Sequence, residues 1–359
     1  MREIIINGRF VGKPVTGVER YAIEITRALD RLLGTCHPLT DDMRFTLIVP
    51  RGATPSFQVD HINVVNYGRL QGHTWEQIDL AFAAKNRTIL NLCNFGPVLS
   101  AKNVTCVHDA HVWLIPENFS WKFNLLYKTL LPITIRRSKA WVTVSKFSGK
   151  MLREFGVAPR QEDATTYNGG DHVDDWRPGS STINRAALPK VYVLALGSRS
   201  KNKNFEHVLA VAKAIYPLGI QTVVVGGNNS KVFGESVAEI GPEIVQLGRL
   251  SDNDICFLMR NATCFLFPSL FEGFGLPPIE AMKNGCPVIA SNTSAMPEVL
   301  GEAALLRDPR SVTDWVEAVK KITLNPQLRD ELIRKGFEQA GKYRWESSAL
   351  TLLKIIKRQ

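Results

Sequence analysis

The chain has 359 residues, more than one hydrophobic core usually supports, so we expect two domains. Apolar residues make up 45% and charged residues 22%, which is ordinary for a soluble globular protein and excludes a disordered chain. The net charge of +10 favours an anionic partner. The sequence has neither zinc-finger spacing nor a basic helix with heptads, which argues against nucleic acid as that partner.

Six cysteines are spread along the chain, and none forms a C-x-x-C pair. They are typical of the reduced, mostly buried thiols of a cytoplasmic protein. Residues 1–10 lack the apolar core of a signal peptide, and no apolar run approaches the roughly 18 residues needed to cross a bilayer. We therefore expect a cytoplasmic protein, peripheral at most to the inner face of the membrane.

Short apolar runs alternate with amphipathic stretches through the first half of the chain. The runs predict buried strands at Ile4–Ile6, Phe45–Val49, Ile89–Leu92, Val104–Val107 and Ala140–Val144. The amphipathic stretches predict helices at Val18–Leu33, Glu76–Ala84 and Lys146–Phe155. Such alternation is typical of a parallel sheet covered by helices on both faces.

The alternation stops at a segment rich in Gly, Asp, Pro and Ser, which we interpret as an interdomain linker. It then resumes and predicts strands at Val191–Gly197, Gln221–Val225, Thr263–Phe267 and Pro287–Ala290, and helices at Phe205–Tyr216, Asp252–Arg260, Pro278–Lys283 and Ser311–Thr323. The predicted fold class is therefore α/β. Its predicted parts are an N-terminal domain over 1–168, the linker over 169–190, a C-terminal domain over 191–340, and a helix over 341–359 that packs back on the N-terminal domain.

The segment from Glu272 to Glu280 carries the strongest functional signal. An apolar strand leads into a loop with Gly273 and Gly275, and two prolines then begin a helix. A loop that enters a helix amino terminus offers free N–H groups and a positive dipole end to an anion. Glycines let the ligand approach the backbone closely.

The two glutamates of this segment extend its chemistry beyond phosphate, because carboxylates accept hydrogen bonds from hydroxyl groups. A nucleotide sugar has hydroxyl groups on either side of its diphosphate and therefore matches this arrangement. The pattern lacks the third glycine of a dinucleotide fingerprint. The alternative is an ordinary strand, loop and helix whose glutamates are solvated.

This segment resembles the E-x7-E signature of the retaining GT-B glycosyltransferases, in particular glycosyltransferase family 4 and its bacterial mannosyltransferases. The resemblance implies two facing Rossmann-like domains with parallel sheets and a deep interdomain cleft, the domain over 1–168 binding the acceptor and the domain over 191–340 binding the nucleotide sugar. It also implies that Glu280 binds the ribose of the donor. The implied contacts to the donor sugar and diphosphate come from Glu272, Gly273, Phe274, Gly275 and the amide of Leu276. Pro277 has no N–H to donate there.

A cationic loop, from Gly197 to Asn204, follows the first strand of the second half. Arginine can hold phosphate oxygens bidentately and lysine acts as a point charge. The resemblance assigns the donor diphosphate to Arg199 and Lys203. The alternative is a solvated surface loop.

Several further residues follow other predicted strands. His108 closes a strand of the first half, and the resemblance implies a histidine near the donor sugar, although a structural role in a turn is the alternative. Thr16 and Gly17 resemble the glycine-containing loop that lines the phosphate or acceptor site. Gly226 and Leu247 resemble the segments near the nucleobase.

Asp252 and Asp254 form a D-x-D pattern, which holds a metal in a different glycosyltransferase fold. Here they begin a predicted helix, where Ser251 and Asp254 suit a capping box. We therefore expect no metal site and no obligatory cofactor, with the nucleotide sugar acting as substrate.

Residues 118–153 contain no acidic residue, and cations and aromatic residues alternate among them, including Trp121, Lys122, Arg136 and Arg137. A basic aromatic helical region can lie on anionic lipid, which suits a lipid-linked acceptor. The alternative is a surface helix whose apolar side faces the core.

The resemblance implies a retaining hexosyltransferase of polysaccharide or lipopolysaccharide assembly, with mannose from GDP-mannose as the leading donor. The acceptor is a saccharide or a lipid-linked saccharide, and no oligomeric state is indicated. The alternatives are a nucleotide-sugar epimerase or phosphorylase of the same fold, and a non-catalytic nucleotide-sugar-binding protein.

Overall fold

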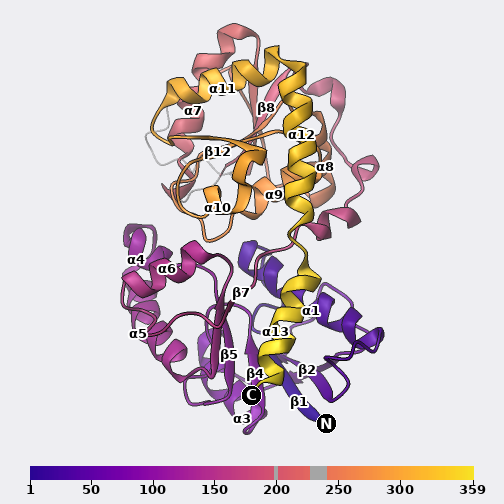
Figure 1. Cartoon of the computed structure of the whole chain (residues 1–359), viewed down its shortest axis with the longest axis vertical. Coiled ribbons are helices and arrows are strands. Elements are labelled where there is room, and N and C mark those ends of the chain that lie inside the picture. Colours follow the sequence, from indigo (N-terminus) through magenta and orange to yellow (C-terminus); the bar gives the residue numbers. More distant parts are fainter. Residues whose placement is uncertain (198–200, 227–240) are drawn as a thin grey trace. The chain divides into compact units, whose positions relative to one another are not determined.

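The computed structural model of the chain describes residues 1–197, 201–226 and 241–359. The chain divides into two compact units (Figure 1). Unit 1 comprises residues 1–169 and 344–359, and unit 2 comprises residues 170–343. Each is considered by itself below.

Unit 1 contains a seven-stranded sheet in its described residues, with strand order β3-β2-β1-β4-β5-β6-β7 and all pairs parallel. Its strands are β1 (Arg2–Asn7), β2 (Met43–Pro50), β3 (Asn63–Tyr67), β4 (Thr88–Asn91), β5 (Asn103–Val107), β6 (Ala140–Thr143) and β7 (Ala164–Thr165). The central strand β1 is buried on both faces, since Ile4, Ile5 and Ile6 are at most 1% exposed. This explains why its sequence is a continuous apolar run.

Helices connect the strands of unit 1. They are α1 (Gly17–Gly34), α2 (Gly72–Thr74), the π-helical turn η1 (Trp75–Asp79), α3 (Leu80–Ala84), α4 (His111–Leu114), the 3-10 turn η2 (Pro116–Asn118), α5 (Trp121–Arg137), α6 (Lys146–Glu154) and α13 (Trp345–Lys357). The helix α13 runs beside α1 (Figure 1), where the ring of Trp345 meets that of Tyr21 edge-on at 5.8 Å. The hydroxyl of Ser348 also donates to the carbonyl of Tyr167 at 2.6 Å. The end of the described chain thus completes the core of unit 1.

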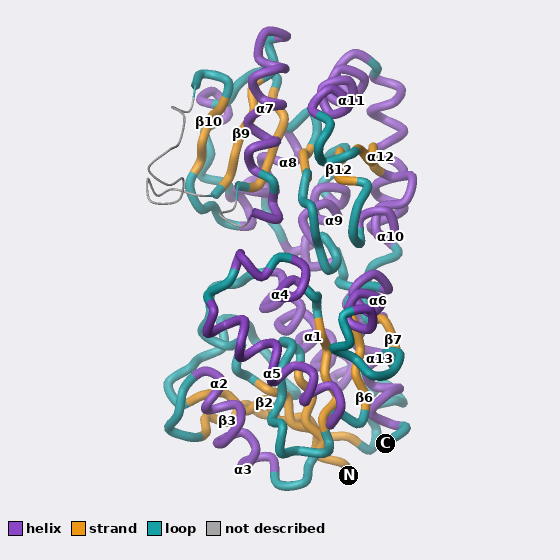
Figure 2. Tube along the Cα trace, turned by 90° about the vertical axis from the view of Figure 1, so that its left-hand side faces the viewer, coloured by secondary structure: helices purple, strands orange, loops and turns teal. Residues whose placement is uncertain are grey.

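Unit 2 contains a six-stranded parallel sheet in its described residues, with strand order β10-β9-β8-β11-β12-β13. Its strands are β8 (Tyr192–Leu196), β9 (Gln221–Val225), β10 (Ile244–Leu247), β11 (Phe265–Phe267), β12 (Val288–Ser291) and β13 (Ala304–Arg307); β9 and β10 lie side by side in Figure 2. Its helices are α7 (Phe205–Ile215), α8 (Asp252–Asn261), α9 (Leu276–Lys283), α10 (Met296–Leu300), α11 (Val312–Leu324) and α12 (Pro326–Gly341), with 3-10 turns η3 (Asp171–Asp175), η4 (Pro178–Ser180), η5 (Arg185–Ala187), η6 (Lys201–Lys203), η7 (Tyr216–Leu218) and η8 (Gly301–Ala303). The predicted α/β class with two Rossmann-like domains is confirmed.

Residues 170–190, which lack periodicity in the sequence, are part of unit 2. The carboxylate of Asp254 accepts hydrogen bonds from the hydroxyl of Ser181 at 2.8 Å and from the amide of Thr182 at 2.7 Å. Ser251 and Asp254 also form the expected capping box of α8. These hydrogen bonds hold the pKa of Asp254 at about 2, although burial acts in the opposite direction.

Four strands have no counterpart in the sequence prediction, and each is an edge strand of its sheet: β3, β7, β10 and β13. Edge strands are less buried than central ones, so their sequences lack the continuous apolar run. In β3, for example, no residue is buried. Within the basic stretch over 118–153, the structure has the predicted buried strand as β6, which separates the helices α5 and α6.

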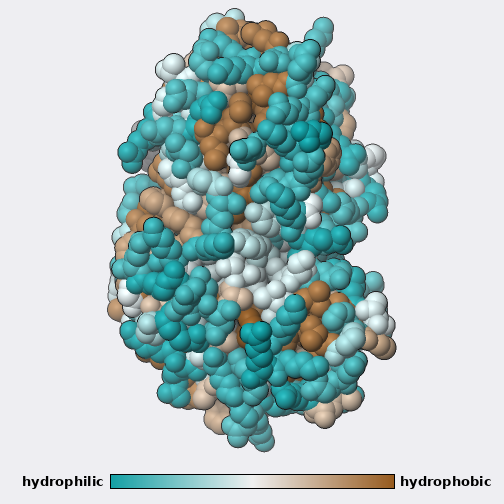
Figure 3. All heavy atoms as spheres, in the orientation of Figure 1, coloured by the Kyte–Doolittle hydropathy of each residue, from teal (hydrophilic) through white to brown (hydrophobic). Residues whose placement is uncertain are grey.

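Hydrophilic residues cover most of the face of the molecule drawn in Figure 3. Among the described residues, no helix combines the length and the apolar character that crossing a membrane requires.

Candidate donor site

The residues predicted to bind the donor in unit 2 follow neighbouring strands at one edge of its sheet. Lys203 follows β8, Gly226 follows β9, Leu247 ends β10, and the loop from Glu272 to Gly275 follows β11. Because all the strands are parallel, these positions share the carboxyl-terminal edge, where open α/β sheets bind ligands. Arg199 lies outside the described residues.

The turn η6 is joined to the loop after β11 by hydrogen bonds. The side-chain amide of Asn202 donates to the carbonyl of Phe271 at 3.1 Å, and the amide of Leu270 donates to the carbonyl of Asn202 at 2.7 Å. These bonds bring the ammonium of Lys203 to 2.6 Å from Oε1 of Glu272. The two side chains, distant in sequence, therefore form an ion pair.

This Lys203–Glu272 pair is partly shielded from solvent, with side-chain exposures of 26% and 11%. The ammonium also lies 4.9 Å from the ring centre of Phe267, a favourable cation–π geometry. The backbone of Glu272 is fixed as well, because its amide donates to the hydroxyl of Ser294 at 3.2 Å. Such orientation lowers the cost of binding a ligand.

Gly275 immediately precedes α9 in a conformation that requires glycine. Its φ is +88°, and a Cβ at this position would lie 2.2 Å from Cε of the buried Met296. Leu276 and Pro277 follow at the helix start, so the backbone turns into α9 within two residues. Phe274 is 3% exposed, and its ring packs edge-on against that of Tyr343.

Glu280 on α9 has a partner that sequence reasoning missed. Nε2 of His172 lies 3.0 Å from Oε1 of Glu280, and the side chain of His172 is 1% exposed. The ring of Trp176 packs edge-on against His172 at 5.5 Å. His172 lies in a segment without periodicity, so the sequence did not indicate that it would pair with Glu280.

Gly226 links the ends of three strands. Its amide donates to the carbonyls of Leu247 at 3.0 Å and of Gly248 at 3.1 Å, and its φ is +102°. A Cβ here would lie 2.7 Å from the carbonyl oxygen of Gly197. Gly226 and Leu247 therefore lie together, next to the end of β8.

His108 of unit 1 is buried at 4% exposure and held by its own domain. Its Nε2 lies 2.8 Å from the carbonyl oxygen of Leu92, so this nitrogen carries the proton and donates. Burial alone would lower the pKa of His108, but the Cys106 sulfur and the Leu92 carbonyl outweigh it, and the pKa lies above its ordinary value. These contacts fit the alternative interpretation, in which His108 has a structural role.

Thr16 and Gly17, the other predicted site residues of unit 1, are exposed at the amino terminus of α1. The hydroxyl of Thr16 donates to the carboxylate of Glu19. A Cβ added to Gly17 would meet no atom within 4 Å, so the space above this helix start is open. Among the described residues, no group of three or more His, Cys, Asp or Glu side chains is arranged to hold a metal ion.

Comparison with known proteins bears on the fold and on the reaction class. The family model of glycosyl transferases group 1 matches residues 180–339. O-antigen chain mannosyltransferase B of Escherichia coli is 29% identical over 271 residues, which cover 71% of this chain and 70% of that protein. O-antigen chain mannosyltransferase RfbU of Salmonella typhimurium strain LT2 is 27% identical over 346 residues, or 92% and 93% of the two chains.

Among solved structures, sucrose-phosphate synthase from Thermosynechococcus elongatus superimposes with a TM-score of 0.74 at 16% identity, covering 100% of this chain and 99% of that one. The similarity confirms the predicted GT-B fold.

Proposed function

We propose that this chain, a glycosyltransferase whose residues 180–339 belong to the glycosyl transferases of group 1, moves a hexose from a nucleotide sugar to a saccharide acceptor with retention at the anomeric carbon. Mannose from GDP-mannose is the proposed donor, and polysaccharide or lipopolysaccharide assembly is the proposed setting. The similarity to two O-antigen mannosyltransferases supports both choices.

The Lys203–Glu272 pair at the carboxyl-terminal edge of the sheet is the observation that carries the proposal. A cation and a carboxylate held 2.6 Å apart suit the junction between a diphosphate and a sugar, because one attracts phosphate oxygens and the other accepts hydroxyl hydrogens. Lys203 stabilises the charge that develops on the leaving diphosphate, and Glu272 orients the sugar. Arg199 is proposed to share the phosphate contact.

The ribose of the donor is proposed to bind Glu280. One carboxylate oxygen of Glu280 is occupied by His172, so the other remains to accept from a ribose hydroxyl. The departing phosphate oxygen then takes the proton of the acceptor hydroxyl on the same face of the sugar. This scheme needs no protein nucleophile and no metal ion, since Lys203 supplies the positive charge.

Incubation of the purified chain with GDP-mannose and a saccharide acceptor tests the proposal. We expect release of GDP, an α-linked product by NMR, and activity that persists in EDTA. Conversion of the donor without an acceptor to an epimeric sugar nucleotide, or an inverted linkage, would contradict it. Stabilisation by UDP-sugars and not by GDP-mannose would reject the proposed donor alone, because bound ligand raises the melting temperature.

A membrane-facing role for α5 is also proposed. Trp121 and Leu125 lie one helical turn apart and are 70% and 60% exposed, and the ammonium of Lys122 lies 5.6 Å from the ring centre of Trp121. Arg136 and Arg137 are exposed at the end of the same helix. Exposed apolar side chains with neighbouring cations suit the surface of an anionic bilayer.

Sedimentation with vesicles tests this role. We expect binding to phosphatidylglycerol vesicles and not to phosphatidylcholine vesicles, and loss of binding in the variant with Arg136→Glu and Arg137→Glu. A control that reverses two exposed lysines of unit 2, Lys213→Glu with Lys321→Glu, has the same net charge and should still bind. An equal loss of vesicle binding in both variants would show that the net charge of the protein, and not α5, causes the binding.

A further inference from the structure

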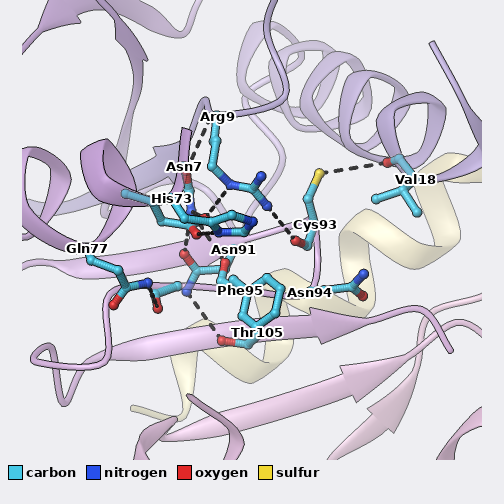
Figure 4. Close-up of polar contacts among 12 residues, drawn as sticks. Asn7, Arg9, Val18, His73, Gln77, Asn91, Cys93, Asn94, Phe95 and Thr105 are labelled. Carbon is cyan, nitrogen blue, oxygen red and sulfur yellow. Dashed lines mark hydrogen bonds and ion pairs between the residues drawn. The ribbon is translucent and has the colours of Figure 1, made fainter. Parts of the chain in front are cut away.

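The side chains of Asn7, Arg9 and His73 lie close together in unit 1 (Figure 4), and all three contact the buried carboxylate of Glu76. The guanidinium Nε of Arg9 and the side-chain amide of Asn7 each donate to Oε1 of Glu76 at 2.8 Å. Nδ1 of His73 lies 3.1 Å from Oε2. Side-chain exposure is 0% for Glu76, 10% for Arg9 and 27% for His73. The network therefore opens toward solvent on the side of His73.

The position of this network is one at which open parallel sheets bind ligands. Asn7 ends β1 and Arg9 follows it, while Cys93, whose carbonyl accepts from Arg9 at 3.2 Å, follows β4. The sulfur of Cys93 lies 3.9 Å from the carbonyl oxygen of Val18 (Figure 4), so the network adjoins the amino terminus of α1.

The local backbone is also unusual. Glu76 lies in the π-helical turn η1, and His73 lies just before it in α2. Single π-helical turns are rare and occur frequently at functional sites. The turn is anchored on either side of Glu76, because the indole N–H of Trp75 donates to the carbonyl of Tyr67 at 2.8 Å and the side-chain amide of Gln77 donates to the carbonyl of Gly96 at 3.0 Å.

The protonation state of Glu76 determines the tautomer of His73. Burial raises the pKa of Glu76, but Arg9 and His73 outweigh burial, and the pKa lies below its ordinary value. Glu76 is therefore ionised near neutrality and can only accept, so Nδ1 of His73 carries the proton. In the neutral ring Nε2 is then an acceptor, on the edge that faces away from Glu76.

Stability alone gives little reason for such a network, since replacing a buried ion pair by well-packed apolar residues is often neutral or stabilising. We propose that His73 and Arg9, both held by Glu76, form a saccharide-binding subsite for the acceptor. Nε2 of His73 accepts a hydrogen bond from an acceptor hydroxyl, and a free N–H of Arg9 donates to an acceptor oxygen. Two of the five N–H donors of Arg9 are used by Glu76 and Cys93. The inference rests on the proposed function, because the subsite supplies the acceptor for transfer.

Two substitutions of His73 separate its two nitrogens. His73→Asn keeps an N–H near Glu76 and loses the Nε2 position, whereas His73→Gln brings an amide to the Nε2 position. The matched control is His61→Gln, which changes an exposed histidine of the same unit. The acceptor probes are octyl glycosides of mannose, glucose, galactose and N-acetylglucosamine, and the kinetics use the one to which the wild-type chain transfers.

We expect His73→Asn to raise the KM for the acceptor about tenfold, the effect of one lost hydrogen bond, and His73→Gln to raise it less. The dissociation constant for GDP should stay unchanged in both, because the donor residues lie in unit 2. An acceptor KM for His73→Asn within about twofold of that of His61→Gln, corresponding to less than one net hydrogen bond, would overturn the subsite.

A second measurement, 15N NMR of histidine-labelled protein, is independent of turnover. The expected spectrum shows Nδ1 of His73 protonated and Nε2 unprotonated in the neutral ring, with Nε2 shifting when an octyl glycoside is added. The opposite tautomer, or no shift with any of the four probes, rejects the subsite. Failure of the wild-type chain to transfer to any probe counts against the proposed function instead, and the NMR titration then decides the subsite alone.

Discussion

Replacing Gly275 by alanine should destabilise unit 2 and weaken donor binding. The backbone φ of +88° costs a non-glycine residue about 1–2 kcal/mol. The new Cβ would also lie 2.2 Å from Cε and 2.9 Å from Sδ of Met296, and overpacking of a full core costs about 1–3 kcal/mol. Together the two effects amount to about 2–5 kcal/mol, or a melting temperature lower by roughly 4–20 °C for a domain of this size.

Calorimetry with a matched set of variants tests this reasoning. Gly341→Ala is the control, because its Cβ would meet no atom within 4 Å, and its melting temperature should be unchanged or slightly higher. Met296→Ala alone leaves a cavity that costs about 2–5 kcal/mol. The double variant should lose at least about 1 kcal/mol less than the sum of the single changes, because the new methyl group enters the vacated space. Additive losses, or a stable Gly275→Ala, would refute the contact argument.

Three further changes concern the charged groups of unit 2. Lys203→Met should reduce kcat/KM for the nucleotide sugar by about 10²–10³-fold, the usual effect of removing one preorganised hydrogen-bond donor from a transition state. Calorimetry should show that this variant is folded although Glu272 has lost its partner, and a rate near that of wild type would argue against a role of Lys203 in transfer. His172→Phe should raise the donor KM about tenfold because it removes the hydrogen bond that orients Glu280, and an unchanged KM would show that Glu280 needs no partner. Asp254→Asn should make the free energy of unfolding less dependent on pH in acid. The pKa of Asp254 is about 2, against an ordinary 3.8, so its ionised carboxylate stabilises the fold above pH 3.8 and this contribution is lost as the pH falls toward 2. Parallel acid unfolding curves for the wild type and this variant would contradict that assignment.

The sequence predicted the buried central strands well because their burial on both faces leaves a continuous apolar run. The strand β1 is an example, and so is β11, whose three residues are all buried. Edge strands give a weaker signal: β10 has one buried residue of four, and β7 is two residues long. These edge strands form because they pair with a neighbouring strand, and the local amino-acid composition does not reveal that pairing.

The candidate site shows the same division. The loop from Glu272 to Gly275 is local in sequence, so its strand, glycines and helix start predict its shape. The pairing of Glu280 with His172 spans 108 residues, and that of Arg9 with Glu76 spans 67. Single polar residues without periodicity become partners only when the strands are ordered in the sheet. Long-range pairs of this kind cannot be predicted from one sequence by pattern alone.

The course of the chain through the two units has a consequence for synthesis on the ribosome. Unit 1 contains α13, so it cannot close its core around Tyr21 until residues 170–343 have been made. At about 5–20 residues per second this delay is roughly 10–35 s. The domain that is translated first is therefore completed last, and during the interval the face of α1 that α13 covers stays open to water and to chaperones. Mutations in α13 should consequently affect the yield of folded protein more than the catalytic rate of the molecules that do fold.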